Sequence, residues 1–180
     1  MIENKKFQEV TVWDLTTYAC LQILKGHNHW VRAVIVSPDS SLLYSGAYNS
    51  IKVWDLKKGE CVKTISGHFS SIYGLEIWKN MLFCATYENR VAVIDLETYR
   101  PITVLTGHVG AVYSLAICNG KLFSASYDQT IRVWSLSTLT CLLTLRSHTS
   151  SVDCLCAVPG TNNNRIYSAS ADHKIKVWIV

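Results

Sequence analysis

The run Ile131-Arg-Val-Trp-Ser-Leu136 decides the fold, because near-copies of it recur along the chain. Each copy places a Trp after alternating apolar residues: Thr11-Val-Trp-Asp-Leu15, Ile51-Lys-Val-Trp-Asp-Leu56 and Ile175-Lys-Val-Trp178. A second signal, a Gly-His or Ser-His pair, recurs about every 40 residues: Gly26-His27, Gly67-His68, Gly107-His108 and Ser147-His148. Two signals that stay in phase over the whole chain indicate tandem copies of one structural unit.

Within each unit the apolar period is two, which predicts β-strands. For the first complete unit we expect strands over 31–35, 42–45, 51–54 and 61–65, separated by turns such as Lys57-Lys-Gly59. Strands this short cannot bury their apolar faces alone, so the copies must stack against one another. The expected fold class is therefore all-β, a β-propeller of about four and a half blades.

The Gly-His pairs also set the expected boundaries of the units. We expect a partial blade with its last two strands over 1–24, complete repeats over 25–65, 66–105 and 106–145, and a repeat lacking its outer strand over 146–180. The repeat over 66–105 is degenerate, because Cys84, Glu88 and Ile94 replace the usual Ser, Asp and Trp. The last repeat carries extra polar residues over 159–164, which we expect at a hairpin tip.

These motifs resemble those of the WD-repeat family, whose units of about 40 residues carry a Gly-His near the start and a Trp-Asp near the end. Four segments are similar, more narrowly, to the C-terminal propeller of RING-type E3 ubiquitin ligases of the TNF receptor-associated factor seven type: Gly26–Ala33, Thr86–Asn89, Leu105–Tyr113 and Phe123–Asp128. This resemblance implies seven repeats that follow a RING finger, a second zinc finger and a coiled coil. The RING finger, the zinc finger and the coiled coil are not in this sequence. It also implies partners among MAP kinase kinase kinases and ubiquitination substrates.

The resemblance further implies how the chain ends fit into a ring. In closed propellers of this family the outer strand of the last blade comes from the N-terminal part of the propeller. We therefore expect a native C-terminus, a truncated N-terminus and about half of a seven-bladed ring. If Met1 is instead the native start, the half-ring would have to close by self-association.

Two sets of residues contain the ingredients of a Ser-His-Asp triad: His108, Ser124 and Asp128 with Trp134, and His148, Ser168 and Asp172 with Trp178. A hydrolase needs one such set in a cleft beside an oxyanion hole. Because the set recurs with a Trp attached, the family resemblance implies a structural hydrogen-bond tetrad instead. In that tetrad the Asp orients the His, the His bonds the Ser, and the Ser reaches the indole N–H. We therefore expect no catalytic residues.

The candidate partner-binding residues lie at fixed offsets from each His and just before each turn acid. Those at the fixed offsets flank a buried Val or Ile, so their side chains should point toward the entrance of the central channel. This expected rim consists of Trp30, Arg32, Tyr73, Tyr87, Tyr113, Tyr127 and Asp153. A surface rich in Trp, Tyr and Arg has the composition of a binding hot spot. The alternative is that the tyrosine rings merely pack between blades.

Composition argues against several other functions. The net charge of +4 is spread along the chain, so no basic arm for nucleic acid is expected. No stretch reaches the ~18 apolar residues of a membrane span, and no signal peptide precedes the first strand. Seven cysteines without a C-x-x-C pair favour neither disulfides nor zinc and fit a reducing compartment. Three of them should be buried in outer strands: Cys20, Cys61 and Cys141.

The favoured function is a protein–protein interaction module without enzyme activity on this chain. We expect it to be the substrate- or partner-binding propeller of a RING-type E3 ubiquitin ligase in signalling, with no metal, no cofactor and no nucleic-acid or membrane partner. We expect a cytoplasmic location, with the nucleus as a further one, because the cysteines fit a reducing compartment. The alternative is a non-ligase WD-repeat scaffold or an F-box-type substrate adaptor.

Overall fold

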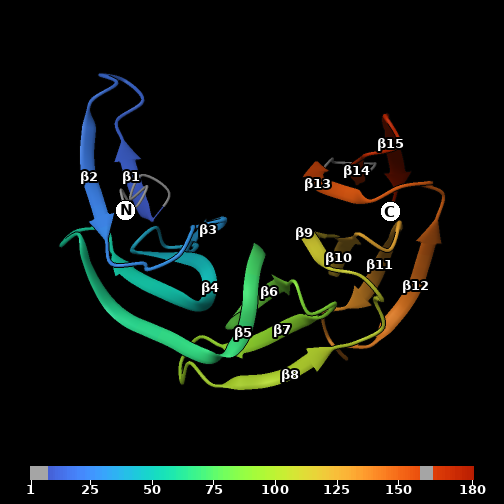
Figure 1. The fold of residues 1–180 in the computed structure, drawn as a ribbon, viewed down its shortest axis with the longest axis horizontal. Helices are drawn as coiled ribbons and strands as arrows, with labels where there is room; N and C mark the ends of the chain where they lie inside the picture. The colour runs from blue at the N-terminus through green and yellow to red at the C-terminus, as the bar shows by residue number, and fades with distance from the viewer. Residues whose placement is uncertain (1–7, 159–163) are drawn as a thin grey trace, which may run out of the picture. The chain divides into compact units, whose positions relative to one another are not determined.

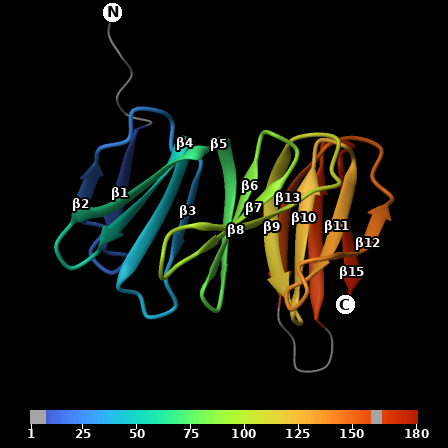
Figure 2. The same cartoon turned by 90° about the horizontal axis from the view of Figure 1, so that it is seen from below.

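The computed structural model describes residues 8–158 and 164–180, and these residues form fifteen strands (Figures 1 and 2). They separate into two compact units, Met1–Ile72 and Tyr73–Val180. No helix in the described ranges is long and apolar enough to cross a membrane. Most of the polar loop expected at a hairpin tip, residues 159–163, lies outside the described residues.

The first unit contains two antiparallel sheets. Strands β1 (Glu9–Trp13) and β2 (Cys20–Lys25) form the smaller sheet. In the other, β3 (Ala33–Val36) pairs with β4 (Leu42–Asp55), which pairs in turn with β5 (Glu60–Trp78). The two sheets are held together by an apolar cluster built on three buried side chains, Leu24, Leu43 and Trp54.

The structure corrects three of the expected strand boundaries in this unit. The strands expected over 42–45 and 51–54 both lie in β4, which folds back on itself because the Leu56 amide donates to the Ser41 carbonyl across 3.1 Å. The turn between them lacks an Asp to accept its backbone N–H groups, and its residues stay in strand pairing, with Tyr48 opposite Ser71. Strand β5 likewise continues beyond the expected end at 65, and β3 begins at 33 instead of 31.

The second unit is built from three sheets of short antiparallel strands (Figure 1). The first sheet joins the end of β5 to β6 (Met81–Thr86), β7 (Val91–Asp95) and β8 (Pro101–Leu105). The second has the order β12-β11-β10-β9, from the strands β9 (Val112–Cys118), β10 (Lys121–Ser126), β11 (Thr130–Ser135) and β12 (Cys141–Arg146). The third has three strands: β13 (Val152–Val158), β14 (Arg165–Ser170) and β15 (Lys174–Ile179).

Two buried clusters stack these three sheets face to face. In the first, Phe83 and Val93 of the β6–β8 sheet pack with Leu122 and Trp134 of the β9–β12 sheet. In the second, residues such as Phe123 on the other face of the β9–β12 sheet pack with the β13–β15 sheet. The β9–β12 sheet therefore buries both of its apolar faces against neighbouring copies, as repeat units that are too small to bury themselves must. The predicted all-β, propeller-type architecture is confirmed.

Candidate functional site

The structure brings the four members of the first predicted set together in the β9–β12 sheet. The Trp134 indole N–H donates to Ser124 Oγ at 2.8 Å, Ser124 Oγ lies 2.8 Å from His108 Nε2, and His108 Nδ1 lies 2.7 Å from Asp128 Oδ2. An indole N–H can only donate, so the Ser124 hydroxyl is left to donate its proton to His108 Nε2. The other ring nitrogen, Nδ1, then carries the hydrogen that His108 donates to the carboxylate.

The β13–β15 sheet repeats this arrangement. His148 Nδ1 lies 2.8 Å from Asp172 Oδ2, and His148 Nε2 lies 2.7 Å from Ser168 Oγ. The Trp178 indole N–H donates to the same Ser168 oxygen at 2.9 Å. The same reasoning on donors assigns the same direction of hydrogen bonding to this set.

The two aspartates are held as carboxylates by converging donors. Burial by itself raises the pKa of Asp128, but hydrogen bonds from His108 and Thr130 and from the Val109 amide outweigh it, and the pKa falls well below its usual range. For Asp172 burial likewise opposes ionisation, while His148 and nearby backbone amides lower the pKa below its usual range. Each ionised carboxylate accepts hydrogen bonds from two separate segments of the chain and so holds these segments together.

A third set, in the first unit, was missing from the sequence-based prediction. His27 Nε2 lies 2.6 Å from Ser45 Oγ, which also accepts the Trp54 indole N–H at 2.8 Å. The acid is absent, and only Ser50 Oγ lies near His27 Nδ1, at 3.5 Å. Burial and then the charge of Lys52 lower the pKa of His27 to about 4. Its signal was present in the sequence, because Gly26-His27 and Trp54 keep the spacing of the complete sets.

The degenerate repeat replaces the polar set with apolar contacts. Cys84 and Ile94 are both buried, and burial raises the pKa of the Cys84 thiol far above its usual range. Glu88 occupies the position of the missing Asp and forms an exposed ion pair with Arg90. Replacing both the serine and the tryptophan removes the hydroxyl and the indole N–H together, so neither is left buried without a partner.

Burial argues against hydrolysis at these sets. Ser124 and Ser168 are almost completely buried, and each oxygen accepts the indole N–H of a tryptophan, so a substrate carbonyl has no access to either oxygen. Among the described residues, no group of three or more His, Cys, Asp or Glu side chains is arranged to hold a metal ion.

The expected burial of three cysteines is wrong. Cys20, Cys61 and Cys141 are all exposed. Cys20 and Cys141 are the first residues of β2 and β12, which are edge strands, and Cys61 is the second residue of β5. The thiols of the latter two face a cation instead: Cys141 Sγ lies 3.5 Å from Arg132 Nη1, and Cys61 Sγ lies 4.0 Å from Lys52 Nζ.

In the first unit, the predicted rim residues Trp30 and Arg32 lie next to one another. The Trp30 side chain is 56% exposed, and Arg32 Cζ lies 5.3 Å from its ring centroid, within the range of a cation–π contact. His29 and Tyr48, which were not predicted, complete a surface cavity of about 290 Å³ with them. The His29 and Tyr48 ring centroids are 5.1 Å apart in an edge-on contact.

In the second unit, the predicted tyrosines gather around Tyr113. The Tyr113 ring centroid lies 5.1 Å from that of Tyr73 and 6.5 Å from that of Tyr127, both edge-on. Burial raises the pKa of Tyr113, and the neighbouring Tyr73, Asp153, Tyr127 and Tyr87 raise it further.

These tyrosines border a pocket of about 560 Å³, which is lined by Tyr87, Glu88, Asn89, Gly110, Ala111, Tyr113 and Tyr127. Glu88 and Asn89 are pocket residues that the sequence reasoning missed. They directly follow Tyr87 in the β6–β7 turn, so their proximity to that predicted residue was the available signal.

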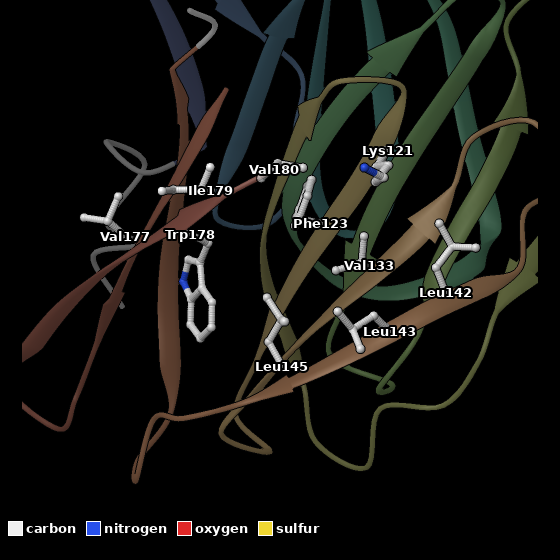
Figure 3. A pocket seen from close by; sticks show the side chains of 10 residues that line it. All are labelled: Lys121, Phe123, Val133, Leu142, Leu143, Leu145, Val177, Trp178, Ile179 and Val180. Atoms are coloured by element: carbon white, nitrogen blue, oxygen red, sulfur yellow. The ribbon is translucent and has the colours of Figure 1, made fainter. Parts of the chain in front are cut away.

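A larger cavity of about 650 Å³ lies beside β15 and was not predicted. Figure 3 shows Leu142, Leu143 and Leu145 of β12 on one side and the residues from Val177 to Val180 on the other. Its lining is aliphatic and aromatic apart from Lys121, so it offers space for packing but no group for catalysis.

Comparison with known proteins agrees with this architecture. A family model described as WD domain, G-beta repeat matches residues 18–55, 99–135 and 139–178. Each matched segment begins just before the outer strand of one sheet, β2, β8 or β12. It then continues into the following strands: β3 and β4, β9 to β11, or β13 to β15. The degenerate repeat, with Cys84 and Ile94, falls largely between the matched segments.

One relative, the nuclear distribution protein PAC1 from Coccidioides posadasii (strain C735), is 46% identical over 37 residues. That match spans 21% of this chain and 8% of the relative. Neither match points to a ubiquitin ligase. Since the repeat model covers more than half of the sequence, this chain belongs to the WD-repeat family, whose domains are typically non-enzymatic modules that bind other proteins.

Proposed function

We propose that this chain captures its protein partner through the surface formed by Trp30 and Arg32, with His29 and Tyr48 beside them. The observation that carries the proposal is the exposed Trp30 ring held against the Arg32 guanidinium. Exposed Trp, Tyr and Arg side chains dominate the energetics of protein interfaces because they bury much area on docking. Their contact with one another already limits their rotation, which lowers the entropy lost on binding.

At a finer level, we propose that the partner is a signalling kinase or a ubiquitination substrate recruited to a RING-type E3 ligase in the cytoplasm or nucleus. The likeness of Gly26–Ala33 and Leu105–Tyr113 to propellers of such ligases supports this reading. A scaffold without ligase activity is the second candidate. It is favoured by the match of 37 residues to a nuclear distribution protein.

The test combines Trp30→Ala with Arg32→Glu. A matched control combines Tyr18→Ala with Lys57→Glu, because both residues are exposed in turns of the same unit and lie outside the Trp30 cavity. Immobilised protein should retain its partner in the wild type and the control, whereas the double variant should bind at least about 30-fold more weakly, as truncation of a hot spot implies. If the wild type, the control and the double variant bind the partner equally and have the same circular dichroism, the binding site does not include Trp30 and Arg32.

The two finer candidates are separated by a second assay on the full-length protein. Ubiquitin transfer to a captured kinase that depends on Trp30 and Arg32 supports the ligase reading. Capture of the same kinase without ubiquitin transfer supports the scaffold.

A further inference from the structure

We propose that the pocket between Tyr87, Tyr113 and Tyr127 binds an arginine side chain presented by a protein partner. This inference rests on the proposed function insofar as the ligand belongs to another protein. It concerns a different surface, in the second unit, and it names the chemistry that this surface recognises.

The pocket has aromatic walls that remain available to a ligand. Tyr87 and Tyr127 are 60% and 63% exposed, which is far more than rings that serve only as packing between sheets. Tyr113 also lines the pocket, is partly buried, and packs edge-on against Tyr73. The volume of about 560 Å³ is large enough for a long side chain to enter between the rings.

One part of the pocket wall is formed by a glycine, Gly110. A Cβ atom on Gly110 would lie 2.8 Å from the backbone nitrogen of Asp128 and 3.1 Å from Tyr127 Cβ. Only glycine therefore allows this loop to lie against the Tyr127 backbone. Gly110 therefore keeps this part of the pocket wall next to Tyr127.

The charge around the pocket favours a cation. Glu88 lines it, and Asp153 lies close enough to Tyr113 that its charge raises the pKa of the phenol. Among the described lining residues there is no Lys, Arg or His. Arg90 pairs with Glu88 from outside the lining, but both side chains are about 40% exposed, and such an ion pair is weak enough to be exchanged for a ligand.

Aromatic faces and carboxylates together match arginine better than other side chains. A planar guanidinium stacks on tyrosine rings and donates paired hydrogen bonds to a carboxylate. An acidic side chain would be repelled by Glu88 and Asp153. An apolar side chain would leave the carboxylate and the tyrosine hydroxyls without new partners.

The experiment uses three synthetic peptides that differ at one position, which holds arginine, lysine or citrulline, the uncharged isostere of arginine. Binding to the whole chain is followed by titration calorimetry and by the fluorescence of the tyrosines. We expect the arginine peptide to bind at least ten-fold more tightly than the citrulline peptide. A lysine peptide should bind with intermediate affinity, because it keeps the charge and loses the planar fork.

Variants then assign the binding to this pocket. Tyr127→Leu and Tyr87→Leu should each weaken the arginine peptide about two- to five-fold, whereas Tyr127→Phe, which keeps the ring, should leave its affinity nearly unchanged. Asp153→Asn should weaken it as well. Because both rings are exposed, these variants should keep the melting temperature of the wild type.

Equal binding of the arginine and citrulline peptides, or equal effects of Tyr127→Leu and Tyr127→Phe, would overturn the proposal. The Trp30→Ala, Arg32→Glu variant separates this failure from failure of the proposed function. If that variant loses its partner while no form binds the arginine peptide, only the arginine pocket is refuted. If it keeps its partner while the arginine peptide binds selectively, only the Trp30 surface is refuted.

Discussion

Substitution of Asp128 by alanine tests whether the buried tetrad stabilises the fold. The carboxylate accepts four hydrogen bonds: from His108 Nδ1 at 2.7 Å, the Val109 amide at 3.0 Å, the Thr130 amide at 3.0 Å and the Thr130 hydroxyl at 2.6 Å. The His108 and Thr130 donors are buried, whereas the exposed Val109 amide can turn to water. Each buried donor that loses its acceptor costs about 1–3 kcal/mol, so the His108 ring nitrogen and the Thr130 amide together cost roughly 2–6 kcal/mol.

A loss of this size is a large part of the total stability of a domain, which is about 5–15 kcal/mol. It should appear as a lower midpoint in urea unfolding followed by tryptophan fluorescence, with an unchanged slope. Asp128→Asn should lose less, because its amide oxygen still accepts one of these bonds. The matched control is Asp95→Ala, since Asp95 caps an exposed turn through the amides of Glu97 and Thr98 and should affect the midpoint little.

The reasoning would be refuted if Asp128→Ala and Asp95→Ala shifted the midpoint equally. That result would mean that the His108 and Thr130 donors find other partners, and that the network adds nothing beyond an ordinary turn. A change in the slope instead of the midpoint would point to an effect on compactness.

Two further predictions concern pH and association. Unfolded His27 takes up a proton near its ordinary pKa of 6.5 and folded His27 only near 4, so its contribution to stability is complete above 6.5 and is lost as the pH falls toward 4. At pH 5 the free energy of unfolding should be lower by about 2 kcal/mol, as measured by urea unfolding. Burial raises the pKa of Glu76 to about 7, which makes stability change with pH in the opposite direction over this range. The His27 contribution is therefore measured as the difference between the wild type and His27→Gln. On β15, Ile175 and Ile179 lie in one row and are 73% and 76% exposed. Replacing both with Lys should reduce the self-association of the protein that light scattering detects as its concentration rises. Unchanged scattering would show that this row does not cause the association.

Local signals in the sequence determined the repeat and its hydrogen-bond sets. Apolar residues alternate with a period of two within each strand, which predicts the strands. The members of each tetrad lie within one repeat, where pairing of short neighbouring strands brings them together. For example, Ser124 and Trp134 lie on the paired strands β10 and β11, and the position of each is fixed by a short turn. Two complete sets could therefore be named residue by residue before their geometry was known.

The predictions were wrong where a repeat lacked one of its usual residues or where spacing carried no information on exposure. The segment around Tyr48 was predicted to be a turn between two strands. Because it has no Asp to accept the backbone N–H groups of such a turn, it pairs with β5 instead. His27 was left out because its repeat lacks the acid, although its serine and tryptophan bonds are intact. The exposure of Cys141 depends on which side of an edge strand faces water, and spacing from a tryptophan does not contain that information.

Tertiary structure alone decided which predicted rim residues share a surface. Tyr87, Tyr113 and Tyr127 come from two different sheets, and they meet only because those sheets stack. The same stacking places Asp153 near Tyr113. Sequence periodicity fixes the face of a strand on which a side chain lies, but the distance between side chains of neighbouring sheets depends on how their apolar faces pack, and that packing is set by all the buried side chains together.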